Sequence, residues 1–393
     1  MSAEPTKASR RTVDLPLCRR RPTALYLHIP FCARICPYCD FAVAPHRRGA
    51  EAAYLDALAA EAEARLPPGF EARTVFIGGG TPTELSVEGL ERLAAILAPW
   101  TGRVREVSIE ANPGTLIPKR IAALRRLGVT RVSLGAQSFD PAVLETLGRF
   151  HKAPAVAESI RRLRAAGIDD INIDLMFAAP GQTLAQLDRD IDAALALEPT
   201  HLSTYGLTWE PGTPFDLARR DGRLRPAPEA LEAAMFRHLR RRLAEAGFRH
   251  YEISNFARPG RVCAHNRVYW RNGAYVGLGN GAASHVAGRR MTNHRAVERY
   301  IAAVHERGRA FATVERLDRD RKIAETAYLA LRVGRGLDRE VGLRDLGIDW
   351  LTHFAEPIRR LTEWGLVETT GSGVRLNERG LAVADRVALE FLD

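Results

Sequence analysis

The sequence predicts an α/β fold, a partial (β/α)6 barrel of the TIM type, joined to a C-terminal α+β domain that resembles a winged helix. Three observations lead to this prediction. Strand-like and helix-like segments alternate between residues 24 and 207, as the βαβ units of a parallel sheet do. Glycines and polar residues recur where the predicted strands end, and after residue 318 helices precede a hairpin-like stretch.

The residues at the strand ends favour a barrel over an open, doubly wound sheet. The residues at or just beyond the carboxyl ends of successive predicted strands are Cys32, Gly78, Glu110, Gln137, Asp174 and Tyr205. In a barrel, the carboxyl ends of all strands converge on one face, where active sites form. An open sheet would spread the same residues along a line, and we therefore expect the barrel.

Each element of the barrel is predicted from a local pattern. Short apolar runs predict strands at residues 24–29, 74–77, 105–110, 131–134, 171–176 and 201–207. Amphipathic stretches predict helices at residues 49–65, 86–97, 118–127, 141–147, 153–166 and 184–197. Beyond them we expect a turn at 211–214, a helix at 228–246 and a strand at 251–256. The glycine-rich stretch 273–281 is either a loop that closes the barrel edge or a close approach of backbone to a ligand.

The same patterns divide the chain into four segments. Residues 1–23 have more basic than acidic residues and little apolar periodicity, so we expect a disordered basic leader. The barrel covers residues 24–260, and an extension of it covers 261–317. The C-terminal domain, 318–393, has predicted helices at 322–333, 350–364 and 377–391 and a hairpin at 366–376. Such a module often binds DNA, but we expect a structural or substrate-covering cap.

Composition restricts the function further. The net charge of the 393 residues is +10, yet nearly all of the 57 basic residues are arginines spread along the chain. No basic stripe is interleaved with aromatic residues, so we expect no nucleic-acid partner. No run approaches 18 apolar residues, so we expect no transmembrane segment. Three of the five cysteines share one motif, which indicates a reducing, cytoplasmic compartment rather than a disulfide framework.

Cys32, Cys36 and Cys39 form that motif, with C-x3-C-x2-C spacing directly after the first predicted strand. Thiolates suit iron–sulfur clusters and zinc. A structural zinc site needs four ligands, so Asp40 or His46 would have to supply the fourth. A chance spacing is the remaining alternative. We favour a [4Fe-4S] cluster, because a cubane held by three cysteines leaves one iron open for chemistry.

The cysteine loop, with Tyr38 before its last cysteine, resembles the signature of radical S-adenosylmethionine (SAM) enzymes. In that family, the open iron binds the amino and carboxylate groups of SAM. Gly79, Gly80 and Thr81 follow the next predicted strand and resemble the motif that contacts the SAM amino group. The resemblance therefore implies a [4Fe-4S] cluster and S-adenosyl-L-methionine as cofactors.

Further polar residues at the strand ends match family positions that contact SAM. The residues concerned lie at or beyond the ends of the third to fifth predicted strands: Glu110, Gln137, Arg149 and Asp174. Each of them alone is more often structural than functional, and their clustering at one edge favours a site. The resemblance also implies that Tyr26, in the first predicted strand, lies against the first SAM molecule. Whether one or two SAM molecules bind stays open.

Over about residues 24–390, the chain resembles the oxygen-independent coproporphyrinogen III oxidases and their relatives, the HemW-type haem chaperones. The oxidases carry a further cysteine two residues after the third, where this chain has Phe41. His265, Asn266, Tyr269 and Trp270 resemble the His-Asn-x-x-Tyr-Trp signature of the chaperones. Residues 176–180, Met-Phe-Ala-Ala-Pro, depart from the Tyr-Gly-Leu-Pro that the family usually has.

The resemblance implies a chaperone that binds haem and delivers it to haem-accepting proteins, the membrane respiratory enzymes, from the cytoplasm or from the periphery of the inner membrane. His265 is a candidate axial haem ligand, with Cys263 as a thiolate alternative, and Tyr269 and Trp270 would stack on the porphyrin. The alternative interpretation is a histidine with satisfied hydrogen bonds in the core.

Two other functions stay open at this point. One is the coproporphyrinogen III oxidase, in which a 5′-deoxyadenosyl radical abstracts hydrogen from propionate side chains, so the sequence leaves the question of an enzyme undecided. The other is a DNA-binding regulator that uses the C-terminal module, which the scattered arginines disfavour.

Overall fold

The computed structural model describes residues 15–47 and 49–392. Its centre is a parallel sheet whose strands neighbour one another in chain order. They are β1 (Ala24–Ile29), β4 (Thr74–Gly79), β5 (Glu106–Ala111), β6 (Arg131–Gln137), β7 (Asp170–Phe177) and β8 (His201–Gly206). The predicted (β/α)6 partial barrel is confirmed.

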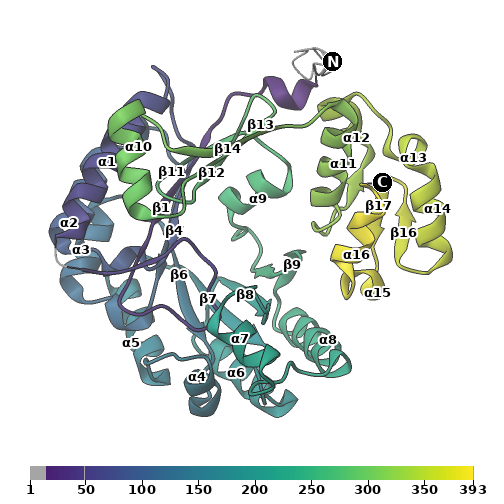
Figure 1. Cartoon of the computed structure of the whole chain (residues 1–393). Helices are drawn as coiled ribbons and strands as arrows, with labels where there is room; N and C mark the ends of the chain where they lie inside the picture. Colours follow the sequence, from purple (N-terminus) through teal and green to yellow (C-terminus); the bar gives the residue numbers. More distant parts are fainter. Residues whose placement is uncertain (1–14, 48, 393) are drawn as a thin grey trace.

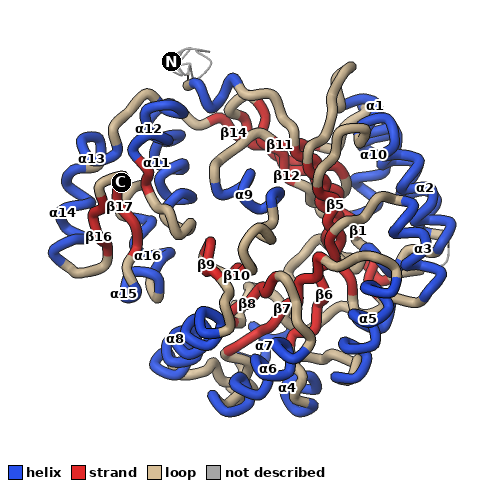
Figure 2. The backbone as a smooth tube through the Cα atoms, turned by 180° about the vertical axis from the view of Figure 1, so that it is seen from behind, coloured by secondary structure: helices blue, strands red, loops and turns tan. Residues whose placement is uncertain are grey.

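Helices cover the outer, convex face of this sheet (Figures 1 and 2). Parallel strands need such crossovers, and the sheet is therefore buried on this side beneath a continuous Leu, Ile and Val core. The helices are α1 (Ala50–Arg65), α2 (Val87–Leu97), α3 (Pro118–Arg126), α4 (Pro141–Thr146), α5 (Ala153–Ala165) and α6 (Leu184–Ala196). The Ser86 side chain caps α2, and Thr183 with Gln186 forms a capping box on α6. Short 3-10 turns lie between strands and helices at η2 (Pro82–Glu84), η3 (Ala98–Trp100) and η4 (Pro113–Thr115).

The sheet continues past β1 into elements that the sequence prediction did not contain. The glycine-rich stretch holds a strand, β11, which pairs in parallel with β1. Three antiparallel strands follow it to the edge. These strands are β11 (Tyr275–Leu278), β12 (Ala283–Val286), β13 (Arg289–Asn293) and β14 (Phe311–Arg316). Glycine at position 277 permits the close approach of the backbone at Ala283 to β11, since a Cβ on it would lie 1.9 Å from the carbonyl oxygen of Ala283.

At the opposite edge, the single strand predicted at 251–256 is wrong. The chain turns there, so that β9 (Arg249–Glu252) and β10 (Asn255–Ala257) form a hairpin that pairs with β8. The helix predicted at 228–246 is present as α8 (Glu229–Glu245). Three helices were not predicted: α7 (Pro214–Arg220), α9 (Ala264–Trp270) and α10 (Val297–Arg307). Both views place α9 on the concave side of the sheet, between the barrel and the C-terminal unit (Figures 1 and 2).

The C-terminal unit is an α+β module with its own core. A three-stranded sheet, in the order β15-β17-β16, contains the predicted hairpin. The predicted helix at 350–364 breaks at Phe354, and the last helix is two short ones. The elements are α11 (Arg319–Ala330), β15 (Leu337–Asp338), α12 (Arg339–Leu346), α13 (Trp350–His353), α14 (Ala355–Glu363), β16 (Val367–Thr370), β17 (Gly373–Leu376), α15 (Glu378–Leu381) and α16 (Ala384–Leu389).

The expected disordered leader lies largely outside the described residues. Its described end forms η1 (Pro16–Arg19), in which Leu17 and Cys18 are buried; together with Leu15 they join the core of the C-terminal unit. These three apolar side chains anchor the segment, since their burial offsets the entropy of ordering it. Within the described residues, no helix combines the length and the apolar character needed to cross a bilayer.

Candidate functional site

The three motif cysteines lie at the carboxyl ends of the parallel strands. Cys32 belongs to the short strand β2 (Phe31–Cys32), which pairs with β3 (Ala44–Pro45), while the N–H of Cys39 donates to the carbonyl oxygen of Cys36 at 3.1 Å. All three thiols are free and partly exposed. They line a cavity of about 320 Å³, here called the mouth cavity, whose walls come from the ends of β4 to β8.

The mouth cavity brings together most of the residues predicted from the sequence. Besides the three cysteines, its lining includes Tyr38, Gly79, Gly80, Thr81, Glu110, Gln137, Arg149 and Asp174. Tyr26 does not line it. The Tyr26 ring stacks on Phe76 with 6.3 Å between ring centroids, and its hydroxyl lies 3.0 Å from Nδ1 of His28.

Both side chains that could have completed a zinc site have other partners. A carboxylate oxygen of Asp40 accepts from the Arg295 guanidinium at 3.0 Å. Nε2 of His46 lies 2.6 Å from a carboxylate oxygen of Glu51. With Asp40 and His46 both engaged, the three cysteines suit a [4Fe-4S] cluster with one open iron better than a closed zinc site.

The glycines after β4 lie where a side chain would not fit. A Cβ on Gly80 would lie 2.5 Å from the carbonyl oxygen of Pro30 and 2.8 Å from Sγ of Cys32. Gly79 has a positive φ of 117°, and its N–H donates to Oε2 of Glu110 at 3.0 Å. Glycine therefore lets the backbone approach the cysteine loop and any ligand bound beside it.

Arg149 connects the cysteine loop to the ends of the neighbouring strands. Its Nη1 lies 3.5 Å from Sγ of Cys36, and its Nη2 donates to Oδ1 of Asn112 at 2.6 Å and to the carbonyl oxygen of Gly135 at 2.7 Å. Asn112 in turn donates to the Thr81 hydroxyl at 2.9 Å. Asn112 was not predicted as a site residue, although it follows Glu110 by two positions and alternate residues of a strand share a face.

Two thiols of this loop, those of Cys32 and Cys39, are protonated when no metal is bound. Burial raises the pKa of Cys32 to about 11, and burial also raises the pKa of Cys39. A cluster binds thiolates, so its insertion has to displace these protons. The guanidinium of Arg149 then offsets part of the negative charge.

Two carboxyl groups face the same cavity. Burial and the neighbouring Asp174 raise the pKa of Glu110 to about 8, although the Gly79 N–H partly opposes the shift. Burial also raises the pKa of Asp174, against hydrogen bonds from Asn172 at 2.6 Å and Ser133 at 3.2 Å. Carboxyl groups in such surroundings are suited to receive hydroxyl or ammonium groups of a ligand.

His265 lies at the other end of the barrel, and the structure does not support its predicted role as an axial ligand. The residue is fully buried, with 0% exposure. Nδ1 lies 3.0 Å from the hydroxyl of Thr74, the first residue of β4, and Nε2 lies 2.8 Å from the hydroxyl of Tyr269. With both nitrogens hydrogen-bonded, His265 fits the core interpretation instead.

Cys263, the thiolate alternative, is also occupied. Its Sγ donates to Oε1 of Glu106 at 3.3 Å, and burial raises the pKa of the thiol to about 12. A protonated, buried thiol is a poor iron ligand.

Comparisons with known proteins agree with this geometry. A model of the radical SAM superfamily matches residues 26–194. The heme chaperone HemW of Bacillus subtilis is 36% identical, and the alignment covers 93% of this chain and 98% of that protein. HemW of Mycobacterium tuberculosis is 35% identical with 95% of each chain covered.

A solved structure is similar over nearly the whole chain. Coproporphyrinogen III oxidase (HemN) of Escherichia coli, a radical SAM enzyme, superposes with a TM-score of 0.82 and 24% identity, covering 97% of this chain and 96% of that one. At this identity, the likeness supports the shared fold, both the partial barrel and the C-terminal unit.

Proposed function

This chain belongs to the HemW family of the radical SAM superfamily, and from that membership we propose that it is a haem chaperone. Membership of the superfamily implies a [4Fe-4S] cluster and SAM. The observation that carries the proposal is the similarity to heme chaperones from end to end, with 98% of the Bacillus subtilis protein covered. At the position where the oxidases carry a further cysteine, this chain has Phe41. This difference agrees with a chaperone.

In this proposal, Cys32, Cys36 and Cys39 hold the cluster. When bound, the cluster supplies an open coordination position for the amino and carboxylate groups of SAM. The backbone at Gly79 and Gly80 leaves room for the ligand, and Glu110 would accept hydrogen bonds from its ribose hydroxyls.

Other residues of the mouth complete the SAM site. Gln137 and Asp174 would supply polar contacts to the ligand from the ends of β6 and β7. Arg149 would pair with the carboxylate of the ligand. Tyr38, whose ring contacts that of Phe215 with 6.0 Å between ring centroids, lines the mouth cavity and would lie beside the cluster. Tyr26 does not line the mouth cavity. Its hydroxyl forms a hydrogen bond with His28 and supports the strand beneath the cavity.

The cargo is haem, and its acceptors are haem-dependent respiratory enzymes of the membrane. The protein would meet them from the cytoplasm as a peripheral partner of the inner membrane. The test is anaerobic: purified, cluster-loaded protein is given haem and then an apo-acceptor. We expect a haem-protein complex and transfer of the haem to the acceptor.

The second candidate function is the oxidase, which the similarity to HemN in fold favours. The same preparation distinguishes the two when it is incubated with coproporphyrinogen III, SAM and a reductant. The chaperone proposal predicts no protoporphyrinogen IX. Formation of that product, together with no haem binding, would overturn it.

A further inference from the structure

A larger cavity flanks the mouth cavity and shares two arginines with it. Its volume is about 710 Å³, and both Arg34 and Arg149 line both cavities. The rest of this flanking cavity comes from α4 and the segment that joins it to α5, chiefly Leu144, Phe150, His151 and Lys152. Its volume is typical of a site for an organic ligand.

His151 has the hydrogen bonding of a metal-binding histidine. Its Nε2 lies 3.0 Å from the carbonyl oxygen of Ala136. A carbonyl oxygen only accepts, so Nε2 carries the proton and the lone pair is on Nδ1. No other described residue bonds to Nδ1. A backbone carbonyl that fixes the tautomer in this way is the usual support for an imidazole ligand.

The charge state of His151 fits the same role. Burial, helped by the nearby Arg149, lowers the pKa of the imidazole to about 4. The ring is therefore neutral at neutral pH, as iron coordination requires. His265 also has a lowered pKa, but both of its nitrogens have partners inside the core.

The remaining lining matches a flat apolar ring with acidic side groups. Phe150 is 66% exposed although it is a large apolar residue. The Arg34 guanidinium lies 4.3 Å from the centroid of its ring. Neither Arg34 nor Lys152 forms an ion pair within the described part of the chain, while Glu145 is the one carboxylate of the lining. Arginine and lysine that lack carboxylate partners are suited to bind propionates.

We propose that the flanking cavity is the haem site, with Nδ1 of His151 as the axial ligand to the iron. Phe150 packs against the macrocycle, and Arg34 and Lys152 pair with its propionates. This inference rests on the proposed function and gives the haem a location that the signature around His265 does not provide. It also places the cargo beside the cluster loop, because Arg149 contacts both.

The test is a haem titration of the full-length protein. The Soret absorption is monitored, and the dissociation constant is obtained from it. In His151→Gln, the amide can still donate to the carbonyl oxygen of Ala136, but no imidazole remains. We expect at least tenfold weaker binding and loss of the imidazole-ligated spectrum. In His151→Gly, free imidazole should restore that spectrum.

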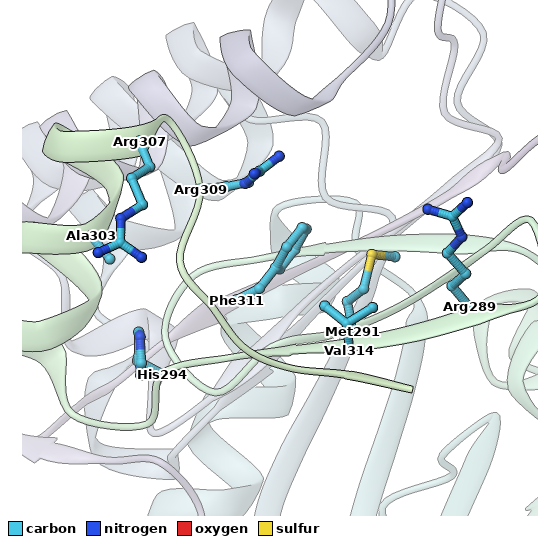
Figure 3. A pocket seen from close by; sticks show the side chains of 8 residues that line it. All are labelled: Arg289, Met291, His294, Ala303, Arg307, Arg309, Phe311 and Val314. Atoms are coloured by element: carbon cyan, nitrogen blue, oxygen red, sulfur yellow. The ribbon is translucent and has the colours of Figure 1, made fainter. Parts of the chain in front are cut away.

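A matched control is His294→Gln. His294 lines a separate pocket of about 350 Å³ between α10 and the strands β13 and β14, beside Arg289, Met291 and Arg309 (Figure 3). That pocket also combines a histidine with arginines and a thioether. We expect His294→Gln to bind haem like the wild type. A loss of haem binding in this variant would place the haem in the pocket of His294 and overturn the inference.

The outcomes separate this inference from the proposed function. If the wild type binds haem and His151→Gln keeps its affinity and spectrum, the site is wrong while the chaperone proposal stands. If the wild type binds no haem, both are overturned. Should His151→Gln fail to fold, Phe150→Asp replaces it, because the exposed ring is dispensable for the core, and unchanged haem affinity in that variant would overturn the site.

Discussion

The two ends of the barrel contain similar residues in opposite situations. At the amino ends of the strands, Glu106 accepts from the N–H groups of Ala264 and His265 at 2.8 and 3.1 Å, and Arg131 pairs with Asp170 at 2.9 Å. At the carboxyl ends, two carboxyl groups and three free thiols face a cavity. The polar groups of the first end bond to one another in the packed interior, whereas those of the second, although they also have partners, line a cavity that can admit a ligand.

This difference shows that the position of a motif in the barrel, and not its residue types alone, indicates whether the motif forms a binding site. A histidine, a cysteine and a carboxylate occur at both ends, so residue types alone do not separate a site from a support. In barrels of this kind, the carboxyl ends carry the chemistry and the amino ends carry stability. The His-Asn-x-x-Tyr-Trp helix α9 therefore belongs with the supporting end, and the following predictions test that division.

The largest effect is expected from the motif cysteines. Cys32→Ser, Cys36→Ser or Cys39→Ser removes a soft ligand from a set of three, so we expect essentially complete loss of the cluster. Iron and sulfide per chain after anaerobic reconstitution measure it. Cys263→Ser is the control at the amino end, and it should keep the wild-type iron content. An equal loss of iron in that variant would contradict the contrast between the two ends of the barrel.

A smaller loss is expected from Gly80→Ala. The new Cβ would lie within 2.8 Å of Sγ of Cys32 and closer still to the backbone of Pro30, so the loop has to shift. We expect several-fold less cluster per chain at the same reconstitution conditions. Gly114→Ala, where nothing lies within 4 Å of the added atom, is the control. Unchanged iron in Gly80→Ala would show that the loop adapts freely.

His265→Ala should act on stability rather than on haem. It leaves the buried hydroxyls of Thr74 and Tyr269 without their partner, and it opens a void, which together cost about 2–4 kcal/mol of unfolding free energy. Denaturant unfolding measures the loss, and His265→Gln should recover part of it. A large drop in haem affinity with unchanged stability would instead return His265 to the site.

The contrast also shows what the sequence could and could not predict. The six parallel strands and their helices depend on local apolar patterns, and all of them were predicted. That polar residues would gather at one end was expected because strand ends converge in a barrel, and the residues that line the mouth cavity were named largely from the family positions that the sequence resembles; their roles stay predictions. One of the two partners of His265 is Thr74, 191 positions away, and no local pattern reports such a contact.

Other elements were missed for similar reasons. The strand β11 was not predicted because its sequence is rich in glycine. Its stability comes from pairing with β1, which no local pattern shows. The helix α9 consists largely of residues with modest helix propensity, and packing against the barrel sustains it. His151 carries no motif of its own, and only the bond to Ala136 and the cavity beside it make it a candidate ligand.

The smallest predicted effect compares one glutamate from each end. The folded-state pKa of Glu110, about 8, exceeds its ordinary value of 4.5. Between these values, the folded protein holds a proton that the unfolded chain has released, so stability falls as the pH rises from about 4.5 to 8. Glu110→Gln cannot ionise, so the variant should gain in melting temperature over the wild type across this range, most above pH 8.

The matched variant at the amino end should behave in the opposite way. The Glu106 side chain accepts hydrogen bonds from two backbone N–H groups and from the Cys263 thiol. Glu106→Gln weakens these charge-assisted bonds, and we expect a loss of about 1–3 kcal/mol at neutral pH. Melting curves of the cluster-free proteins between pH 5 and pH 8.5 measure both. Parallel curves for the two variants would mean that folded Glu110 does not retain its proton up to about pH 8, and the distinction between site and support would fail.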